Sequence, residues 1–131
     1  MRFLLDTHVW LWSLLEPARL GPITRAALQS AEARLWLSPV SVWEAHMLAE
    51  KGRIQLGTPP GDWIAGALRR SPVREAGLTH PIALLSRTVA LPHADPADRF
   101  IAATAIALDL ELLTADEILL ASAVPTRSCR E

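Results

Sequence analysis

The chain has 131 residues, enough for one domain of ordinary size and too few for two comfortable hydrophobic cores. Half of the residues are apolar and 21% are charged, which excludes a disordered chain. The single cysteine excludes an internal disulfide framework and a cysteine-rich zinc site, and the net charge of −1 provides no overall basic field for a polyanion. Arg2 is not followed by a signal-like apolar segment, and no apolar run reaches membrane-spanning length, so we expect a cytoplasmic protein.

Short apolar runs alternate with longer segments of helical period, and this alternation predicts an α/β domain with a mainly parallel sheet. Strands are expected at residues 2–5, 35–37, 73–76, 111–114 and near 122–126. Helices are expected at residues 7–15, 22–33, 39–51, 61–70, 80–91 and 96–108. The segment 52–61, rich in proline and glycine, is expected to be a loop inside one domain.

Two acids follow predicted strands, where ligands of an open α/β sheet bind. Asp6 follows the strand at residues 2–5, and Asp116 comes shortly after the strand at residues 111–114. If these strands are parallel, both carboxylates emerge at the same edge of the sheet. The alternative is that each aspartate only caps the helix that follows it, a role that stabilises by roughly 1 kcal/mol.

Glu44 lies in the predicted helix at residues 39–51, on the same broad arc as Val40, Trp43, Met47 and Leu48. We therefore expect its carboxylate to point toward the core, where it needs a proton, a cation or several donors. The alternative is a capping box, because Ser41 and Glu44 match the S-x-x-E pattern.

Asp95 and Asp98 begin a helix that is otherwise almost entirely apolar, so its charged end is expected to face an edge or a site. Interaction with the helix dipole accounts well for Asp95 but less well for two acids three residues apart. Two carboxylates about 4 Å apart repel by roughly 4 kcal/mol at an effective dielectric constant near 20. Converging acids therefore require a cation, and an all-oxygen site favours Mg²⁺ or Mn²⁺ and hydrolysis of a phosphodiester.

Four motifs occur together in order: "LLDTH", "SVWE", "HADPADRFIAATA" and "LLTAD". In order and spacing they resemble those of PIN domains, most closely the VapC toxins of bacterial toxin–antitoxin pairs, over essentially the whole chain. The resemblance implies that residues 1–131 form a PIN-like nuclease domain, an α/β/α sandwich. It also implies Mg²⁺- or Mn²⁺-dependent endoribonuclease activity, a homodimer and inhibition by a cognate antitoxin protein.

The resemblance also assigns roles to individual residues. Asp6, Glu44, Asp98 and Asp116 correspond to the four metal-binding acids of the family. Supporting roles follow for four further residues: a Thr7 hydroxyl hydrogen bond to Asp6, a helix-start or outer role for Asp95, a small hydroxyl position for Thr114, and a phosphate contact or ion pair for Arg99. The chain is less basic than many RNA-cleaving relatives, which bears on its affinity for RNA.

The remaining signals are weaker. The four histidines, His8, His46, His80 and His93, have no paired metal spacing, and only His8 lies near a predicted ligand. The tryptophans are expected mostly in packing, although Trp12 and the first two helices offer a groove for an amphipathic antitoxin helix. Two rival functions remain, a catalytically silent PIN-like binding module and another aspartate-based phosphoryl-transfer domain. The "DTH" sequence disfavours the second, because a haloacid-type phosphatase carries Asp-x-Asp after its first strand.

Overall fold

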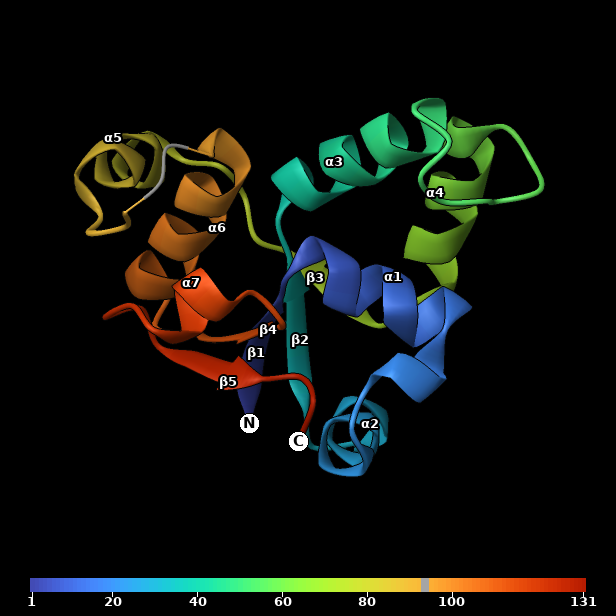
Figure 1. The fold of residues 1–131 in the computed structure, drawn as a ribbon, viewed down its shortest axis with the longest axis horizontal. Coiled ribbons are helices and arrows are strands. Elements are labelled where there is room, and N and C mark those ends of the chain that lie inside the picture. The colour runs from blue at the N-terminus through green and yellow to red at the C-terminus, as the bar shows by residue number, and fades with distance from the viewer. Residues whose placement is uncertain (93–94) are drawn as a thin grey trace.

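The computed structural model describes residues 1–92 and 95–131, with helices and strands alternating as the sequence predicts (Figure 1). The strands are β1 (Arg2–Leu5), β2 (Arg34–Leu37), β3 (Val73–Glu75), β4 (Glu111–Thr114) and β5 (Thr126–Ser128). The helices are α1 (Thr7–Leu15), the 3₁₀ helix η1 (Pro17–Arg19), α2 (Pro22–Gln29), α3 (Pro39–Glu50), α4 (Pro60–Arg70), α5 (His80–Thr88), α6 (Pro96–Ala107) and α7 (Glu117–Leu120). None of the helices in the described part of the chain combines the length and apolar character that a bilayer crossing demands.

The strands form one five-stranded sheet in the order β3-β2-β1-β4-β5. All four strand pairings are parallel, which confirms the predicted sheet. The central strand β1 pairs with β2 on one side and with β4 on the other, so that Leu5 lies opposite Leu113. Because parallel strands end at the same edge, the residues that follow β1, β2 and β4 emerge together.

Helices cover both faces of this sheet (Figure 1). Phe3 and Leu5 belong to a buried cluster that contains Trp10 of α1 and reaches α3 and α4. Leu4, between them in β1, packs instead with Ile101 of α6 in a second buried cluster. Successive side chains of a strand point to opposite faces, so an unbroken apolar run fills both cores. The predicted α/β/α sandwich is therefore confirmed.

The second helix is shorter than the sequence predicts, because it ends at Gln29 and not at Ala33. Ser30 begins a turn there, and its hydroxyl accepts a hydrogen bond from the Glu32 N–H at 3.2 Å. A hydroxyl that binds nearby main chain competes with the helical hydrogen bonds. The short elements η1 and α7 are absent from the prediction, since three or four residues show no helical periodicity.

The last strand begins later than predicted, at Thr126 and not near residue 122. Pro125 has no N–H to donate to a neighbouring strand, although its carbonyl accepts from Leu112 at 2.8 Å. The preceding segment turns at Ser122, whose hydroxyl accepts from the Val124 N–H at 3.2 Å. Pairing with β4 therefore starts only after the proline.

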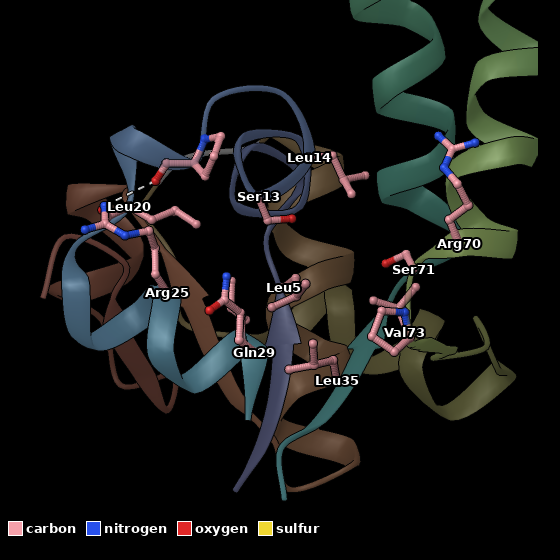
Figure 2. Close-up of a pocket in the computed structure, with 13 residues that line it drawn as sticks. Leu5, Ser13, Leu14, Leu20, Arg25, Gln29, Leu35, Arg70, Ser71 and Val73 are labelled. Carbon is pink, nitrogen blue, oxygen red and sulfur yellow. Dashed lines mark hydrogen bonds between the residues drawn. The ribbon is translucent and has the colours of Figure 1, made fainter. Parts of the chain in front are cut away.

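A cleft of about 190 Å³ opens on the face of the sheet that α1 covers (Figure 2). Leu5 and Leu35 of the sheet line its floor, and Leu14 and Leu20 line the side formed by α1 and the segment before α2. Val73, at the start of β3, lies on the opposite side. The cleft is mainly apolar, with the cationic side chains Arg25 and Arg70 on its two sides.

Candidate active site

Asp6 follows β1 directly and begins α1 as its N-cap. Its Oδ1 accepts from the Thr7 N–H at 2.9 Å, and its Oδ2 accepts from the Thr114 hydroxyl at 2.6 Å. Thr114 ends β4, which lies beside β1, so the hydroxyl and the carboxylate meet at the carboxyl edge of the sheet. Burial raises the pKa of Asp6, and these two hydrogen bonds oppose the rise.

The Thr7 hydroxyl connects α1 to α3. It donates to the Glu44 carboxylate and lies 2.9 Å from the Ser41 hydroxyl, and both hydroxyl residues are fully buried. Burial raises the pKa of Glu44, the Thr7 hydrogen bond lowers it, and the charge of Asp6 raises it again. The prediction that the Thr7 hydroxyl supports Asp6 is wrong: the hydroxyl supports Glu44, and the main-chain N–H of Thr7 supports Asp6.

The start of α3 decides between the two interpretations of Glu44. The Ser38 hydroxyl accepts from the Val40 N–H at 3.1 Å and caps the helix, with Pro39 in the first turn. Ser41 therefore lies inside the helix, and the capping-box alternative is wrong. Its inward hydroxyl, one turn before Glu44, is the part of this site that the sequence analysis missed. The signal was a hydroxyl residue three positions before an inward acid.

The inward face of α3 differs from the predicted arc. Trp43 is 61% exposed, whereas Ser41, Ala45 and Leu48 are the buried residues. Small side chains on this stripe let the backbone of α3 approach α1, and the bulky indole is left outside. Glu44 adjoins the buried stripe and is itself partly buried, so its expected position on the inner side is correct although that of Trp43 is not.

Asp98, in the first turn of α6, joins the other acids electrostatically. Its pKa is raised to about 7, first by burial and then by the negative charges of Asp6, Asp95, Asp116 and Glu44. These acids belong to four different helices: Asp6 to α1, Glu44 to α3, Asp95 and Asp98 to α6, and Asp116 to α7. The ionised form of Asp98 is disfavoured because it faces like charge in a partly buried position. Asp6, Glu44, Asp98 and Asp116 are called the acid cluster below.

The helix-capping alternative is also correct for several aspartates. Asp95 caps α6, with its Oδ1 accepting from the Ala97 N–H at 3.0 Å, which confirms its predicted helix-start role. Asp116 caps α7 through two N–H groups at 2.8 and 3.1 Å. The Thr114 hydroxyl also accepts from the Asp116 N–H at 3.0 Å, so Thr114 connects two members of the acid cluster. A cap and a place in the cluster are therefore compatible.

Arg99 has a role that neither of its predicted ones includes. Among the described residues, its guanidinium donates to main-chain carbonyls at the end of α5 and in the segment after it, at 2.8 Å to Ser86, 2.9 Å to Val89, 3.3 Å to Arg87 and 3.4 Å to Leu91. The predicted helix at residues 80–91 ends at Thr88 instead, and its free carbonyls are bound by this side chain. In this conformation Arg99 fastens α5 to α6.

Of the histidines that the structure describes, His8 is the one that lies near the acid cluster. His8 is exposed on α1, where its ring packs against Trp12 with centroids 5.7 Å apart. Its charge opposes the rise in pKa of both Asp6 and Glu44, so it lies close to the acid cluster. His93, expected not to be a ligand, lies outside the described residues.

The four carboxylates of the acid cluster stand apart from one another and bind local partners. Within residues 1–92 and 95–131, no three His, Cys, Asp or Glu side chains are arranged to hold a metal ion. Asp6 and Asp116 cap helices, and Glu44 accepts from the Thr7 hydroxyl. Each of these carboxylates therefore accepts a hydrogen bond from a nearby N–H or O–H group. Mutual repulsion favours such local partners over close approach.

Sequence comparison gives the family that this fold and acidic edge define. The PIN domain family model matches residues 3–124, and the chain belongs to the PIN domain family. Among individual relatives, Ribonuclease VapC22 of Mycobacterium tuberculosis (strain ATCC 25618 / H37Rv) is 40% identical over 116 residues. That alignment covers 86% of this chain and 85% of the relative.

Solved structures share the same architecture. VapBC2 from Rickettsia felis, bound to a promoter DNA fragment, matches with a TM-score of 0.70 and 13% identity over 98% of each chain. VapBC-1 from nontypeable Haemophilus influenzae matches with a TM-score of 0.68 and 16% identity over 100% of each chain. FitAcB from Neisseria gonorrhoeae matches with a TM-score of 0.61 and 22% identity over 95% of each chain. At these identities the likeness shows the fold.

Proposed function

We propose that the chain is a divalent-metal-dependent endoribonuclease and the toxin of a type II toxin–antitoxin pair, with residues 1–131 acting as one domain. The observation that carries this proposal is that Asp6, Glu44 and Asp116, from three other elements, lie close enough to Asp98 for their charges to raise its pKa. Such a field destabilises the ionised site unless positive charge is added. The 40% identity to a protein named a ribonuclease supports the proposal that this chain cleaves RNA.

The residues of the acid cluster fit a hard divalent cation. Carboxylate oxygens are the donors that Mg²⁺ and Mn²⁺ prefer, and Asp6, Glu44, Asp98 and Asp116 would hold the ion. When bound, such an ion polarises a phosphoryl oxygen and lowers the pKa of a coordinated water. In the hydrolysis, a water oxygen would form a bond to phosphorus while the P–O bond to the leaving ribose oxygen breaks, the water giving up a proton and the leaving oxygen taking one up.

The chain's own groups prepare this site by orientation. Thr114 fixes Oδ2 of Asp6, and the Thr7 hydroxyl fixes the Glu44 carboxylate. Hydroxyl groups that hold carboxylates in place reduce the reorganisation needed when ligand and substrate bind. Asp98, with its pKa near 7, is the acid at which a proton and a cation compete near neutral pH.

The direct test is cleavage of a total-RNA pool by the purified protein with Mg²⁺, Mn²⁺ or EDTA. Asp98→Asn removes one carboxylate that would hold the cation, so it should lower the cleavage rate by at least about 100-fold. Asp62→Asn is the matched control, because Asp62 is an exposed acid in the first turn of a different helix, α4. This variant should cleave RNA at the wild-type rate. Equal cleavage by wild type and Asp98→Asn would contradict the proposal. No cleavage by any of these folded proteins would favour the silent binding module.

We propose a homodimer formed through α3 and α6. A fully apolar cleft of about 240 Å³ lies between them, lined by Val40, Trp43, Pro96, Ala97 and Phe100. The 61% exposed Trp43 and this cleft share one patch, and a two-fold axis would place the indole of each copy against the patch of the other. Trp43→Glu should give monomers in sedimentation analysis. Ile23→Glu, also at a 61% exposed position, should leave the dimer intact.

An antitoxin partner is part of the same proposal, since structural neighbours from Mycobacterium tuberculosis and Klebsiella pneumoniae are described as toxin–antitoxin proteins. The cleft of Figure 2 lies between the first two helices, but it is not the groove expected from the sequence, because Trp12 does not line it. We propose this cleft as the antitoxin site. Its apolar floor and the flanking Arg25 and Arg70 suit an amphipathic helix with acidic flanks. Leu14→Asp should weaken antitoxin binding and leave RNA cleavage unchanged, whereas normal binding would place the antitoxin elsewhere.

A further inference from the structure

A second hollow of about 480 Å³ lies between α1, the end of α3 and the loop after it. His8, Trp12, Arg19 and Arg53 are among its lining residues, together with apolar side chains such as Leu48. This hollow is called the α1–α3 cleft. Its volume is within the range of protein sites that hold small ligands.

The α1–α3 cleft lies beside the acid cluster, although none of the four acids is among its lining residues. His8 lines the cleft, and its charge acts on both Asp6 and Glu44. Leu48 lies one helical turn after Glu44 on α3, and Trp12 lies about 9 Å along α1 from Asp6 at 1.5 Å per residue. A group bound in the cleft is therefore held beside the carboxylates.

The walls of the cleft combine aromatic rings with positive charge. The exposed His8 ring rests against Trp12, and the guanidinium of Arg19 lies 5.2 Å from the centroid of the Trp12 ring. Arg53 supplies a further exposed guanidinium. The one acid of the lining, Glu16, pairs with Arg19 at 2.5 Å. Because that pair is exposed, it is weak, and Arg19 can exchange this partner for a phosphate.

We infer that the α1–α3 cleft holds one nucleotide of a single-stranded RNA substrate, an assignment that rests on the proposed function. The base stacks on the His8–Trp12 pair, and Arg19 and Arg53 contact the adjoining phosphates. Aromatic platforms beside arginines are the common means of binding unpaired bases. The cleft supplies cationic contacts close to the acid cluster, although the chain as a whole has a net charge of −1.

The test measures RNA binding without cleavage. Fluorescence anisotropy follows a fluorescein-labelled 12-nucleotide single-stranded RNA, with every protein carrying Asp98→Asn and the buffer containing EDTA. Adding Trp12→Leu should weaken binding at least about fivefold, and Trp12→Phe, which retains a stacking ring, should restore most of it. Arg53→Ala should weaken binding. It should also reduce the slope of log binding constant against log salt concentration by about one, the value for one lost phosphate contact. Arg34 is an exposed arginine at the start of β2, at the end of the sheet away from the acid cluster, so Arg34→Ala should have no effect.

The outcomes separate this inference from the proposed activity. Unchanged RNA binding by both Trp12→Leu and Arg53→Ala would overturn it, even if Asp98→Asn abolishes cleavage as proposed. Normal RNA binding combined with lost antitoxin binding in these variants would also overturn it and assign the cleft to a protein partner. Conversely, the expected binding losses would support the cleft even if the Asp98→Asn protein still cut RNA with Mg²⁺, a result that would contradict the acid cluster alone.

Discussion

Two neighbouring residues of α6, Asp98 and Arg99, belong to two very different polar regions. Around Arg99, guanidinium donors bind main-chain carbonyls that the end of α5 leaves free. Around Asp98, carboxylates face one another, and its pKa rises to about 7. The first region matches donors with acceptors and stabilises the fold, whereas the second gathers like charges and destabilises it. Groups that lower stability in this way are common at functional sites, and the proposed cation site would account for the acid cluster.

The largest effect on stability is expected at Arg99. Arg99→Ala should lower the free energy of unfolding by about 3 kcal/mol, because charged hydrogen bonds to several carbonyls are lost. Urea denaturation measures this loss. Arg87→Ala, an exposed neighbour in the last turn of α5, is the control and should change stability by less than about 0.5 kcal/mol. A small effect at Arg99 would remove the distinction between the two regions.

The acid cluster should behave in the opposite way when pH is raised without metal. Folded Asp98 has a pKa near 7 against an ordinary value of 3.8, so between these values the folded protein holds a proton that the unfolded chain releases. Stability is therefore highest at low pH within this window and is lost as pH rises through 7. From pH 5 to pH 8 the free energy of unfolding should fall by about 2 kcal/mol.

Asp98→Asn sharpens this pH prediction, since the variant cannot ionise at this position. Urea denaturation in EDTA should give it a flatter pH profile than wild type and greater stability at pH 8. The exposed-acid control Asp62→Asn should follow the wild-type profile. Parallel profiles for wild type and Asp98→Asn would show that Asp98 ionises as an ordinary surface acid.

A smaller effect is expected at Thr114, which connects Asp6 to the main chain at Asp116. Thr114→Val keeps the shape but loses both hydrogen bonds, and should lower the free energy of unfolding by about 1 kcal/mol. It should also raise the pKa of Asp6 further, because the Thr114 hydrogen bond lowers it. Mg²⁺ affinity, measured by calorimetry, should fall about tenfold.

Thr104→Val provides the comparison for that measurement. Thr104 is equally buried, but its hydroxyl donates to the Phe100 carbonyl within α6, at 2.7 Å. Its replacement should therefore leave Mg²⁺ affinity unchanged. Equal losses of affinity in the two variants would mean that Thr114 acts through general packing and not by orienting Asp6.

Much of the fold could be predicted from the sequence because its signals are local. Apolar runs such as residues 2–5 mark buried parallel strands, and Ser38 followed by Pro39 marks the start of α3. The late start of β5 was missed because a proline next to a short strand shifts pairing by only a few residues. That the four acids lie near one another could be predicted because three of them follow strands or begin helices, positions that the chain order reveals.

The missed features depend on contacts that no local pattern records. The carbonyls bound by Arg99 lie 8 to 13 residues away, and they become available only because α5 ends early. The Thr7 hydroxyl turns to Glu44, 37 residues distant, because α3 presents Ser41 and small residues to α1. For the same reason Trp43, predicted inside from an arc of apolar residues, is outside. Helix rotation is set by the neighbouring helix, and that neighbour cannot be read from the periodicity of one segment.

The most direct measurement is a carboxyl ¹³C NMR titration of Asp98, first in EDTA and then with saturating Mg²⁺, with Asp98→Asn used to assign the signal. We expect a midpoint near 7 in EDTA and a clearly lower midpoint with Mg²⁺, because the cation replaces the proton among the four carboxylates. A midpoint near 3.8 in EDTA, or one near 7 that Mg²⁺ does not move, would contradict the claim that these acids form a coupled cation site.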